Sequence, residues 1–194
     1  MRNILIVGAG KSSPYLIKYL IEHSQKQQLN LHITDIKIEH LIHYKKYNNC
    51  SVSTINILND KEREKYILES DIVISMLPAR YHIILAKSCI KLDRNLLTAS
   101  YVSDEMKSLS SEIKDKNLIF LNEIGLDPGI DHMSAKKIID KLKDESYNIN
   151  SFKSYTGGLI APESDNNSWN YKFTWNPRNV VLAGQGSPAK YIEN

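Results

Sequence analysis

Four ionisable side chains lie close together in the segment Asn122–Ala135, whose sequence is NEIGLDPGIDHMSA. They are Glu123, Asp127, Asp131 and His132, and the glycines and the proline between them favour a tight loop. Carboxylates and imidazoles can hold an amine and exchange protons with it. Structural roles compete with this chemistry, because Asp131 can cap the next helix, Glu123 can accept from backbone donors, and a histidine at a helix start is often structural. The segment is a candidate active-site loop.

A glycine-rich turn near the start of the chain suggests a phosphate-binding loop. The apolar run Asn3–Val7 is followed by the sequence GAGKSS and then by apolar residues at helical spacing. A P-loop is excluded, because Leu5 stands where that motif requires its first glycine. The alternative is a dinucleotide loop, in which one glycine makes the turn, the next lets a pyrophosphate approach, and a serine replaces the third glycine. The predicted cofactor-binding residues of this loop are Gly8, Gly10, Lys11, Ser12 and Ser13.

Asp35 ends the second predicted strand and strengthens this interpretation. It follows the loop at about the spacing at which a carboxylate accepts hydrogen bonds from the ribose hydroxyls of the cofactor. Because that carboxylate would repel a 2′-phosphate, we expect NAD, and Lys37 nearby leaves NADP possible. A cap on the following helix is the structural alternative for Asp35. Four residues end the fourth predicted strand, where the ribose would pass, although the two most apolar ones could equally be core. They are Ser75, Met76, Leu77 and Pro78.

Short apolar runs alternate with helical patterns along most of the chain. Buried parallel strands are typically continuous apolar runs, whereas helices show a period of about 3.6 residues. The alternation predicts an α/β fold with a doubly wound parallel sheet of the Rossmann type. One of the intervening helices, at roughly residues 38–47, has a weak pattern. The predicted strands are Asn3–Val7, Leu29–Thr34, Ser51–Ile57, Asp71–Met76, Asn95–Ala99 and Leu118–Leu121.

The pattern changes after Lys143. Residues Tyr147–Tyr155 alternate like an antiparallel strand, and Val180–Ala183 is a further apolar run. We therefore predict a NAD(P)-binding Rossmann domain at residues 1–125. Residues 126–194 would be the incomplete start of a second, β-rich α+β substrate domain. An unpaired strand edge in this part would favour a homodimer.

The composition excludes several classes of function. The chain has 194 residues, a formal net charge of +3 and a pI near 8.7. It shows no clustered basic face, so we expect no nucleic-acid partner. Two cysteines give neither a disulfide framework nor metal spacing, and His40 and His43 lack further ligands, so we expect no metal. No apolar run approaches the roughly 18 residues of a membrane span and no signal peptide is apparent, which predicts a cytoplasmic protein without a membrane partner.

Three segments together resemble the L-glutamate-forming saccharopine dehydrogenases. They are LLTASYVSDEM at Leu96, NEIGLDPGIDHMSA at Asn122 and SYTGGLIAPESDNNSWNYKFTWNP at Ser154. The resemblance spans essentially the whole chain, and it implies the N-terminal half of such an enzyme. It also implies a reaction in which a nicotinamide cofactor accepts hydride from saccharopine, or returns it to the imine of glutamate and α-aminoadipate semialdehyde.

The resemblance further implies roles for individual residues. Asp127 is the candidate catalytic residue, which would hold the substrate amine and then assist proton transfer. Thr156 stands where the family usually has a cysteine, and the family's arginine clamp for substrate carboxylates lies beyond Asn194. The substrate-binding residues that the resemblance implies are Ser100, Tyr101, Asp127, Tyr155, Thr156, Gly157 and Trp175.

Two other functions stay open at this point. Related imine reductases of the carboxyspermidine dehydrogenase type also reduce imines of amino acids, although the APE…NYKF segment argues against them. A non-catalytic dinucleotide-binding module is the alternative from a different class, because the wall of the substrate site would be incomplete. NAD binding without saccharopine binding would favour the module, whereas measurable turnover would exclude it.

Overall fold

The computed structural model describes residues 1–155, 157–158, 160–173 and 180–181. It divides the chain into two compact units, Met1–Asn148 and Ile149–Asn194. The first unit contains a six-stranded sheet with strand order β3-β2-β1-β4-β5-β6, and each neighbouring pair is parallel. This is the doubly wound arrangement that the sequence predicts. The strands are β1 (Arg2–Val7), β2 (Leu29–Asp35), β3 (Cys50–Thr54), β4 (Ile72–Ser75), β5 (Asn95–Thr98) and β6 (Phe120–Leu121).

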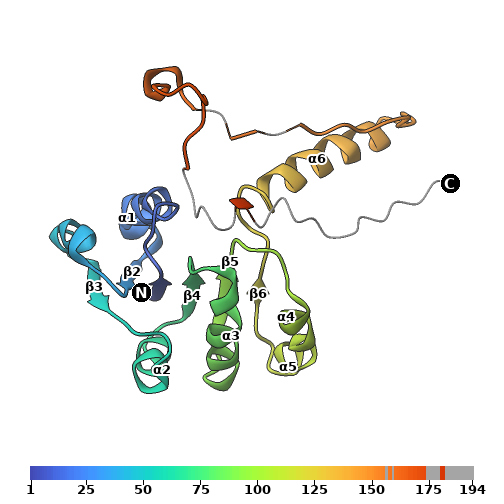
Figure 1. Cartoon of the computed structure of the whole chain (residues 1–194). Helices are drawn as coiled ribbons and strands as arrows, with labels where there is room; N and C mark the ends of the chain where they lie inside the picture. Colours follow the sequence, from blue (N-terminus) through green and yellow to red (C-terminus); the bar gives the residue numbers. More distant parts are fainter. Residues whose placement is uncertain (156, 159, 174–179, 182–194) are drawn as a thin grey trace. The chain divides into compact units, whose positions relative to one another are not determined.

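Helices cover the sheet on both faces (Figure 1). Successive side chains of a strand point to opposite faces, so β1 contributes Ile4 and Ile6 to one core and Leu5 and Val7 to the other. The first core includes residues of α1 and η1, and the second includes residues of α2, α3 and α4. The helices of this unit are α1 (Pro14–Gln27), η1 (Glu39–Lys46), α2 (Asp60–Leu68), η2 (Ala79–Tyr81), α3 (His82–Lys91), α4 (Asp104–Ser108), α5 (Ser110–Asp115) and α6 (Ile130–Asp144).

Three elements of this unit differ from the prediction. The third strand ends at Thr54 and not at the predicted Ile57. The weak helix at residues 38–47 is a 3₁₀ helix, η1. The sixth strand is shorter than predicted, because backbone donors at its start bond elsewhere. Leu118 N–H donates to the carbonyl oxygen of Ile113 at 3.0 Å, and Ile119 N–H donates to Asn95 Oδ1 at 2.8 Å. Only Phe120–Leu121 remains as a strand at this edge of the sheet.

The strand predicted at Tyr147–Tyr155 is wrong. No residue of that range is in a strand, and the chain leaves α6 through Ser146, which has a left-handed φ of +64°. Val180 and Val181 are helical, whereas the rest of the run predicted at Val180–Ala183 lies outside the described residues. In the described part of the second unit, the single named element is the 3₁₀ turn η3 (Pro162–Ser164). The strand edge on which the homodimer expectation rested is therefore not found there.

Helix α6 has an apolar side that the described residues of its unit leave uncovered. None of its residues is buried, and Ile130, Met133 and Ile138 are exposed. The segment that leads into it, Asn122–Gly129, is held by hydrogen bonds within itself and to residues 98–102. None of the described helices is both long and apolar enough to cross a membrane.

Candidate functional site

Gly8 and Gly10 of the predicted phosphate loop are in different structural environments. Gly8 follows β1 with a φ of +91°, and a Cβ there would lie 3.0 Å from the backbone carbonyl of Met76. A side chain at Gly8 would therefore strain the turn and press on the end of β4. Gly10 has nothing within 4 Å of its Cβ position, so the space above it is open. Open space at Gly10, next to the start of α1, suits a pyrophosphate.

Ser13 stands at the third glycine position of the predicted dinucleotide loop. It is buried, and its Oγ donates to the carbonyl oxygen of Gly10 at 2.8 Å. Lys11 and Ser12 are exposed beside it. A small residue at position 13 thus lets α1 pack closely against the loop, and leaves two polar side chains on the solvent side.

Asp35 ties the end of β2 to this loop. Its Oδ2 accepts a hydrogen bond from the backbone N–H of Ala9 at 2.6 Å, and its Oδ1 accepts a longer one, 3.4 Å, from Lys37 N–H. His40 Nε2 lies 2.9 Å from the carbonyl oxygen of Ala9, so this nitrogen carries the hydrogen. Asp35 does not cap η1, whose N-cap residue is Ile38. The carboxylate stands where the ribose of a dinucleotide is expected.

A cavity of about 330 Å³ lies between the phosphate loop and the ends of β2 and β4. It brings together most of the predicted cofactor residues, including the two strand-end apolar ones. Lys11 and Ser13 line a neighbouring cavity of about 460 Å³ instead. Ser75 is buried and is absent from both linings. The predicted residues that line the first cavity are Gly8, Gly10, Asp35, Met76, Leu77 and Pro78.

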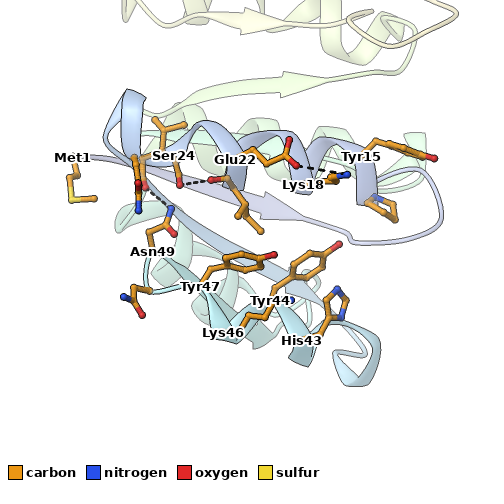
Figure 2. Close-up of a pocket in the computed structure, with 15 residues that line it drawn as sticks. Met1, Tyr15, Lys18, Glu22, Ser24, His43, Tyr44, Lys46, Tyr47 and Asn49 are labelled. Carbon is orange, nitrogen blue, oxygen red and sulfur yellow. Dashed lines mark hydrogen bonds and ion pairs between the residues drawn. The ribbon is translucent and has the colours of Figure 1, made fainter.

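The largest of the described cavities, about 740 Å³, lies elsewhere, between α1 and η1 (Figure 2). Tyr15, Tyr44 and Tyr47 line it together with charged side chains such as Lys46. None of the residues that the sequence predicts for cofactor or substrate is part of its lining. The largest cavity is therefore not the one that the predicted cofactor residues line.

Backbone hydrogen bonds close the loop that contains the ionisable cluster. Gly125 N–H donates to the carbonyl oxygen of Pro128 at 2.8 Å, and Ile130 N–H donates to that of Gly125 at 3.0 Å. The Asp127–Pro128 peptide bond is cis. Gly129 has a φ of +150°, and a Cβ there would lie 2.2 Å from the Gly125 carbonyl oxygen. The loop is a closed turn that only glycine at position 129 permits.

Three of the four ionisable groups in this loop have structural partners. Glu123 Oε1 accepts from the backbone N–H of Val102 at 2.9 Å, as predicted. Asp131 Oδ1 accepts from Gly129 N–H at 2.9 Å and lies 2.8 Å from His132 Nδ1. Desolvation acts to raise the pKa of Asp131, but the hydrogen bonds from His132 and Gly129 lower it overall. Asp131 thus binds the backbone at the start of α6.

Asp127 is paired with a second predicted substrate residue. Tyr101 Oη donates to Asp127 Oδ1 at 2.8 Å, although the two residues are 26 positions apart in the sequence. This hydrogen bond, helped by desolvation and nearby carboxylates, raises the pKa of Tyr101, so the phenol stays protonated. Both side chains are exposed, and within the described part of the chain Asp127 Oδ2 accepts no hydrogen bond. The pair presents one carboxylate oxygen to solvent.

The same loop contains a group of possible metal ligands. One ligand atom from each of Asp127, Asp131 and His132 falls within 4.8 Å of the others. The sequence led us to expect no metal. Within this group Asp131 and His132 bind each other, and Asp127 accepts from Tyr101.

His82 is a buried residue that the sequence did not bring into the site. Its Nδ1 lies 2.7 Å from Ser75 Oγ, and its Nε2 lies 2.8 Å from Ser100 Oγ and 3.0 Å from Thr98 Oγ1. Burial lowers the pKa of His82 to about 4, so the ring is neutral near pH 7. Its partners lie between positions 75 and 100 of the sequence, so no local spacing indicated the cluster.

The remaining predicted substrate residues lie in the second unit. Tyr155 and Gly157 are both exposed. Thr156 and Trp175 lie outside the described residues. Their predicted roles opposite Tyr101 and Asp127 stay predictions.

Comparison with known proteins identifies the family of the chain. Residues 4–121 match the family model described as the saccharopine dehydrogenase NADP binding domain, and residues 125–194 match the saccharopine dehydrogenase C-terminal domain. The mitochondrial alpha-aminoadipic semialdehyde synthase of Rattus norvegicus is 38% identical over 100% of this chain and 20% of its own length. The saccharopine dehydrogenase [NADP(+), L-glutamate-forming] of Schizosaccharomyces pombe is 36% identical over 100% of this chain and 42% of its own length.

A solved structure agrees with these relatives. Apo histidine-tagged saccharopine dehydrogenase (L-Glu forming) from Saccharomyces cerevisiae matches 94% of this chain and 40% of its own, with a TM-score of 0.83 and 33% identity. The chain spans less than half the length of these relatives. The matches cover both predicted domains and confirm the resemblance seen in the sequence motifs. The chain belongs to the saccharopine dehydrogenase family.

Proposed function

We propose that the chain is the N-terminal part of an L-glutamate-forming saccharopine dehydrogenase. Such an enzyme oxidises the secondary amine of saccharopine to an imine, which water splits into glutamate and α-aminoadipate semialdehyde. The observation that carries the proposal is the Tyr101–Asp127 pair, in which Tyr101 follows β5 and Asp127 follows β6. Strand β5 is next to β4, and the residues directly after β4 line the dinucleotide cavity. We further propose that residues 1–125 form the cofactor domain and residues 126–194 begin the substrate domain, which the limits of the two family models support.

The residues of the phosphate loop fit a nicotinamide dinucleotide. Such a cofactor, when bound, accepts or donates the hydride. The open space at Gly10 leaves room for the pyrophosphate, and the cavity between β2 and β4 leaves room for a ribose. The protein's part is to bind and orient, because hydride transfer depends on holding the reacting C–N bond against the nicotinamide ring.

Asp127 holds the substrate amine in this proposal. A carboxylate oxygen that faces solvent can bind the protonated amine of saccharopine and receive its proton before oxidation. Tyr101 holds the other oxygen and fixes the direction in which the carboxylate points. Orientation is the first role of Asp127, and proton transfer is the second.

The exchange Asp127→Asn tests this assignment in the natural full-length protein. Because a hydrogen bond to a charged group contributes about 2 kcal/mol, we expect kcat/KM for saccharopine to fall about 30-fold. The Kd for the nicotinamide cofactor should stay within about twofold, because Asp127 is not part of the dinucleotide cavity.

The matched control for this variant is Asp140→Asn. Asp140 is on α6, where it pairs with Lys136 on the helix surface. The substitution Asp140→Asn removes the same charge as Asp127→Asn but lies outside the proposed site, so kcat/KM for saccharopine should stay near the parent value. A kcat/KM for Asp127→Asn within twofold of the parent would remove Asp127 from the mechanism.

The choice between NAD and NADP centres on Asp35. The matching family model is an NADP binding domain and the relative from Schizosaccharomyces pombe is NADP(+)-dependent by name, which favours NADP, whereas the sequence led us to expect NAD. The carboxylate of Asp35 would repel a 2′-phosphate, and Lys37 two positions later offers the opposite charge. The relative affinity for NAD and NADP therefore depends on two opposing effects, repulsion of the 2′-phosphate by Asp35 and its attraction by Lys37.

Replacing Asp35 with asparagine should shift that balance toward NADP. The amide cannot repel a phosphate, so we expect the ratio of NAD Kd to NADP Kd to rise about tenfold, as for the loss of one unfavourable charge contact. Isothermal titration with each cofactor measures both values. Lys37→Gln should move the ratio in the opposite direction, and an unchanged ratio in both variants would place the 2′ group elsewhere.

Dinucleotide binding without turnover is a second candidate function. It is favoured by the position of the cofactor cavity, whose lining lies entirely within the first compact unit. The 194-residue chain should then bind the cofactor in a titration. Saccharopine oxidation by that chain would exclude the non-catalytic function, and binding of neither molecule would contradict both candidates.

A further inference from the structure

The imidazole of His82 connects the carboxyl ends of two neighbouring strands. Ser75 and Thr98 are the last residues of β4 and β5, and they are partners in the parallel register of these strands. The ring contacts both hydroxyls and also that of Ser100, which follows β5. His82, Ser75 and Thr98 are buried, whereas Ser100 is half-buried. One side of this hydrogen-bonded group therefore reaches from the core toward the proposed substrate site.

A neutral imidazole has one N–H group, so its two nitrogens have opposite roles. If Nε2 carries the hydrogen, it donates toward Ser100 Oγ at 2.8 Å, with Thr98 Oγ1 slightly farther away at 3.0 Å, and Nδ1 accepts from the hydroxyl of Ser75. Burial favours the neutral ring, and the N-terminal end of α3, where His82 is the first residue, also disfavours a positive charge. The ring can thus set the direction of the Ser100 hydroxyl by filling one of its acceptor positions.

Building on the proposed function, we infer that His82 is a positioning residue for the substrate. Its Nε2–H group donates to Ser100 Oγ and turns the hydroxyl hydrogen of Ser100 away from the core. Ser100 then donates that hydrogen to one of the three carboxylates of saccharopine. His82 does not touch the substrate, and its effect passes through Ser100.

Two substitutions of similar polarity separate this role from simple packing. The amide nitrogen of glutamine in His82→Gln can reach the position of Nε2, whereas the shorter side chain in His82→Asn reaches only that of Nδ1. In the natural full-length protein we expect His82→Asn to lower kcat/KM for saccharopine about tenfold, as for one lost hydrogen bond. His82→Gln should stay within about threefold of the parent, because it keeps the donor to Ser100.

The KM for the cofactor distinguishes the proposed role from a packing defect, because a packing defect would change this KM as well. It should stay within about twofold in both variants, and their melting temperatures should be similar. If His82→Gln loses as much kcat/KM as His82→Asn, the donor at Nε2 is not what matters and the inference is wrong.

A double-mutant cycle with Ser100→Ala gives the decisive comparison. Because His82 acts through Ser100, the change His82→Asn should cost less than about twofold once Ser100 is alanine. Additive losses would overturn the inference while leaving the proposed function intact. If the parent protein does not oxidise saccharopine at all, the proposed function fails first, and the inference fails with it.

Discussion

Substitution of Gly129 by alanine should lower kcat/KM for saccharopine by more than about 100-fold while leaving the cofactor site in place. The new Cβ would lie 2.2 Å from the carbonyl oxygen of Gly125 and 2.6 Å from its backbone nitrogen. The φ of +150° at position 129 also strains any side chain. Because the overlap is with backbone, rotation of a side chain cannot relieve it. The turn from Gly125 to Gly129 must open.

The release of this turn should be local. Strain and overlap of this kind cost about 3 kcal/mol or more, and α6, which follows the turn, buries none of its residues. Helix α6 therefore adds no buried residue that opposes local opening, whereas the sheet has two buried cores of its own. Asp127 would lose its fixed position, and we expect kcat/KM to fall by more than about 100-fold.

Hydrogen exchange and titration check this result together. The amides of Gly125 and Ile130 should lose protection, because their acceptors are the carbonyls of Pro128 and Gly125. The cofactor Kd should stay within about twofold of the parent. Gly158→Ala is the control, since its added Cβ would meet only a ring carbon of Tyr171 at 3.9 Å. Preserved protection of both amides in Gly129→Ala would contradict the predicted opening.

Most of the sheet could be predicted because buried parallel strands leave a strong pattern in the sequence. The run Asn3–Val7 is apolar at every position but one, and the structure buries its alternate residues in two separate cores. The sixth strand was predicted too long. The sequence pattern could not show that the Leu118 N–H would donate to the carbonyl oxygen of Ile113 and the Ile119 N–H to the side chain of Asn95. Tyr147–Tyr155 alternates in sequence, yet alternation forms a strand only where a partner strand is present.

The candidate site was predictable only where its residues belong to a recognisable sequence motif. Local motifs identified the glycine loop and Asp35, and a family resemblance identified Tyr101 and Asp127. The Tyr101–Asp127 hydrogen bond itself joins two segments that the sequence keeps apart. His82 has no motif, because its partners come from the ends of two strands and meet only in the folded sheet. Contacts of this kind depend on tertiary structure.

Substitution of Gly10 by valine should remove cofactor binding and leave the fold unchanged. Nothing lies within 4 Å of the Cβ position of Gly10, and its φ is not in the left-handed region, so the folded protein can accept a side chain there. A pyrophosphate in contact with the backbone at this position cannot share the space with an isopropyl group. We expect the Kd for the nicotinamide cofactor to rise by more than about 100-fold, with a melting temperature within about 2 °C of the parent.

The neighbouring glycine provides the matched comparison, because its reason for being glycine is different. Alanine at Gly8 would place its Cβ 3.0 Å from the backbone of Met76 at a φ of +91°. At about 1–3 kcal/mol for a strained φ, Gly8→Ala should lower the melting temperature by about 5 °C. Thermal denaturation and cofactor titration of both variants therefore separate the glycine that the fold requires from the glycine that the ligand requires. If Gly10→Val binds the cofactor as tightly as the parent does, the pyrophosphate does not lie over this loop.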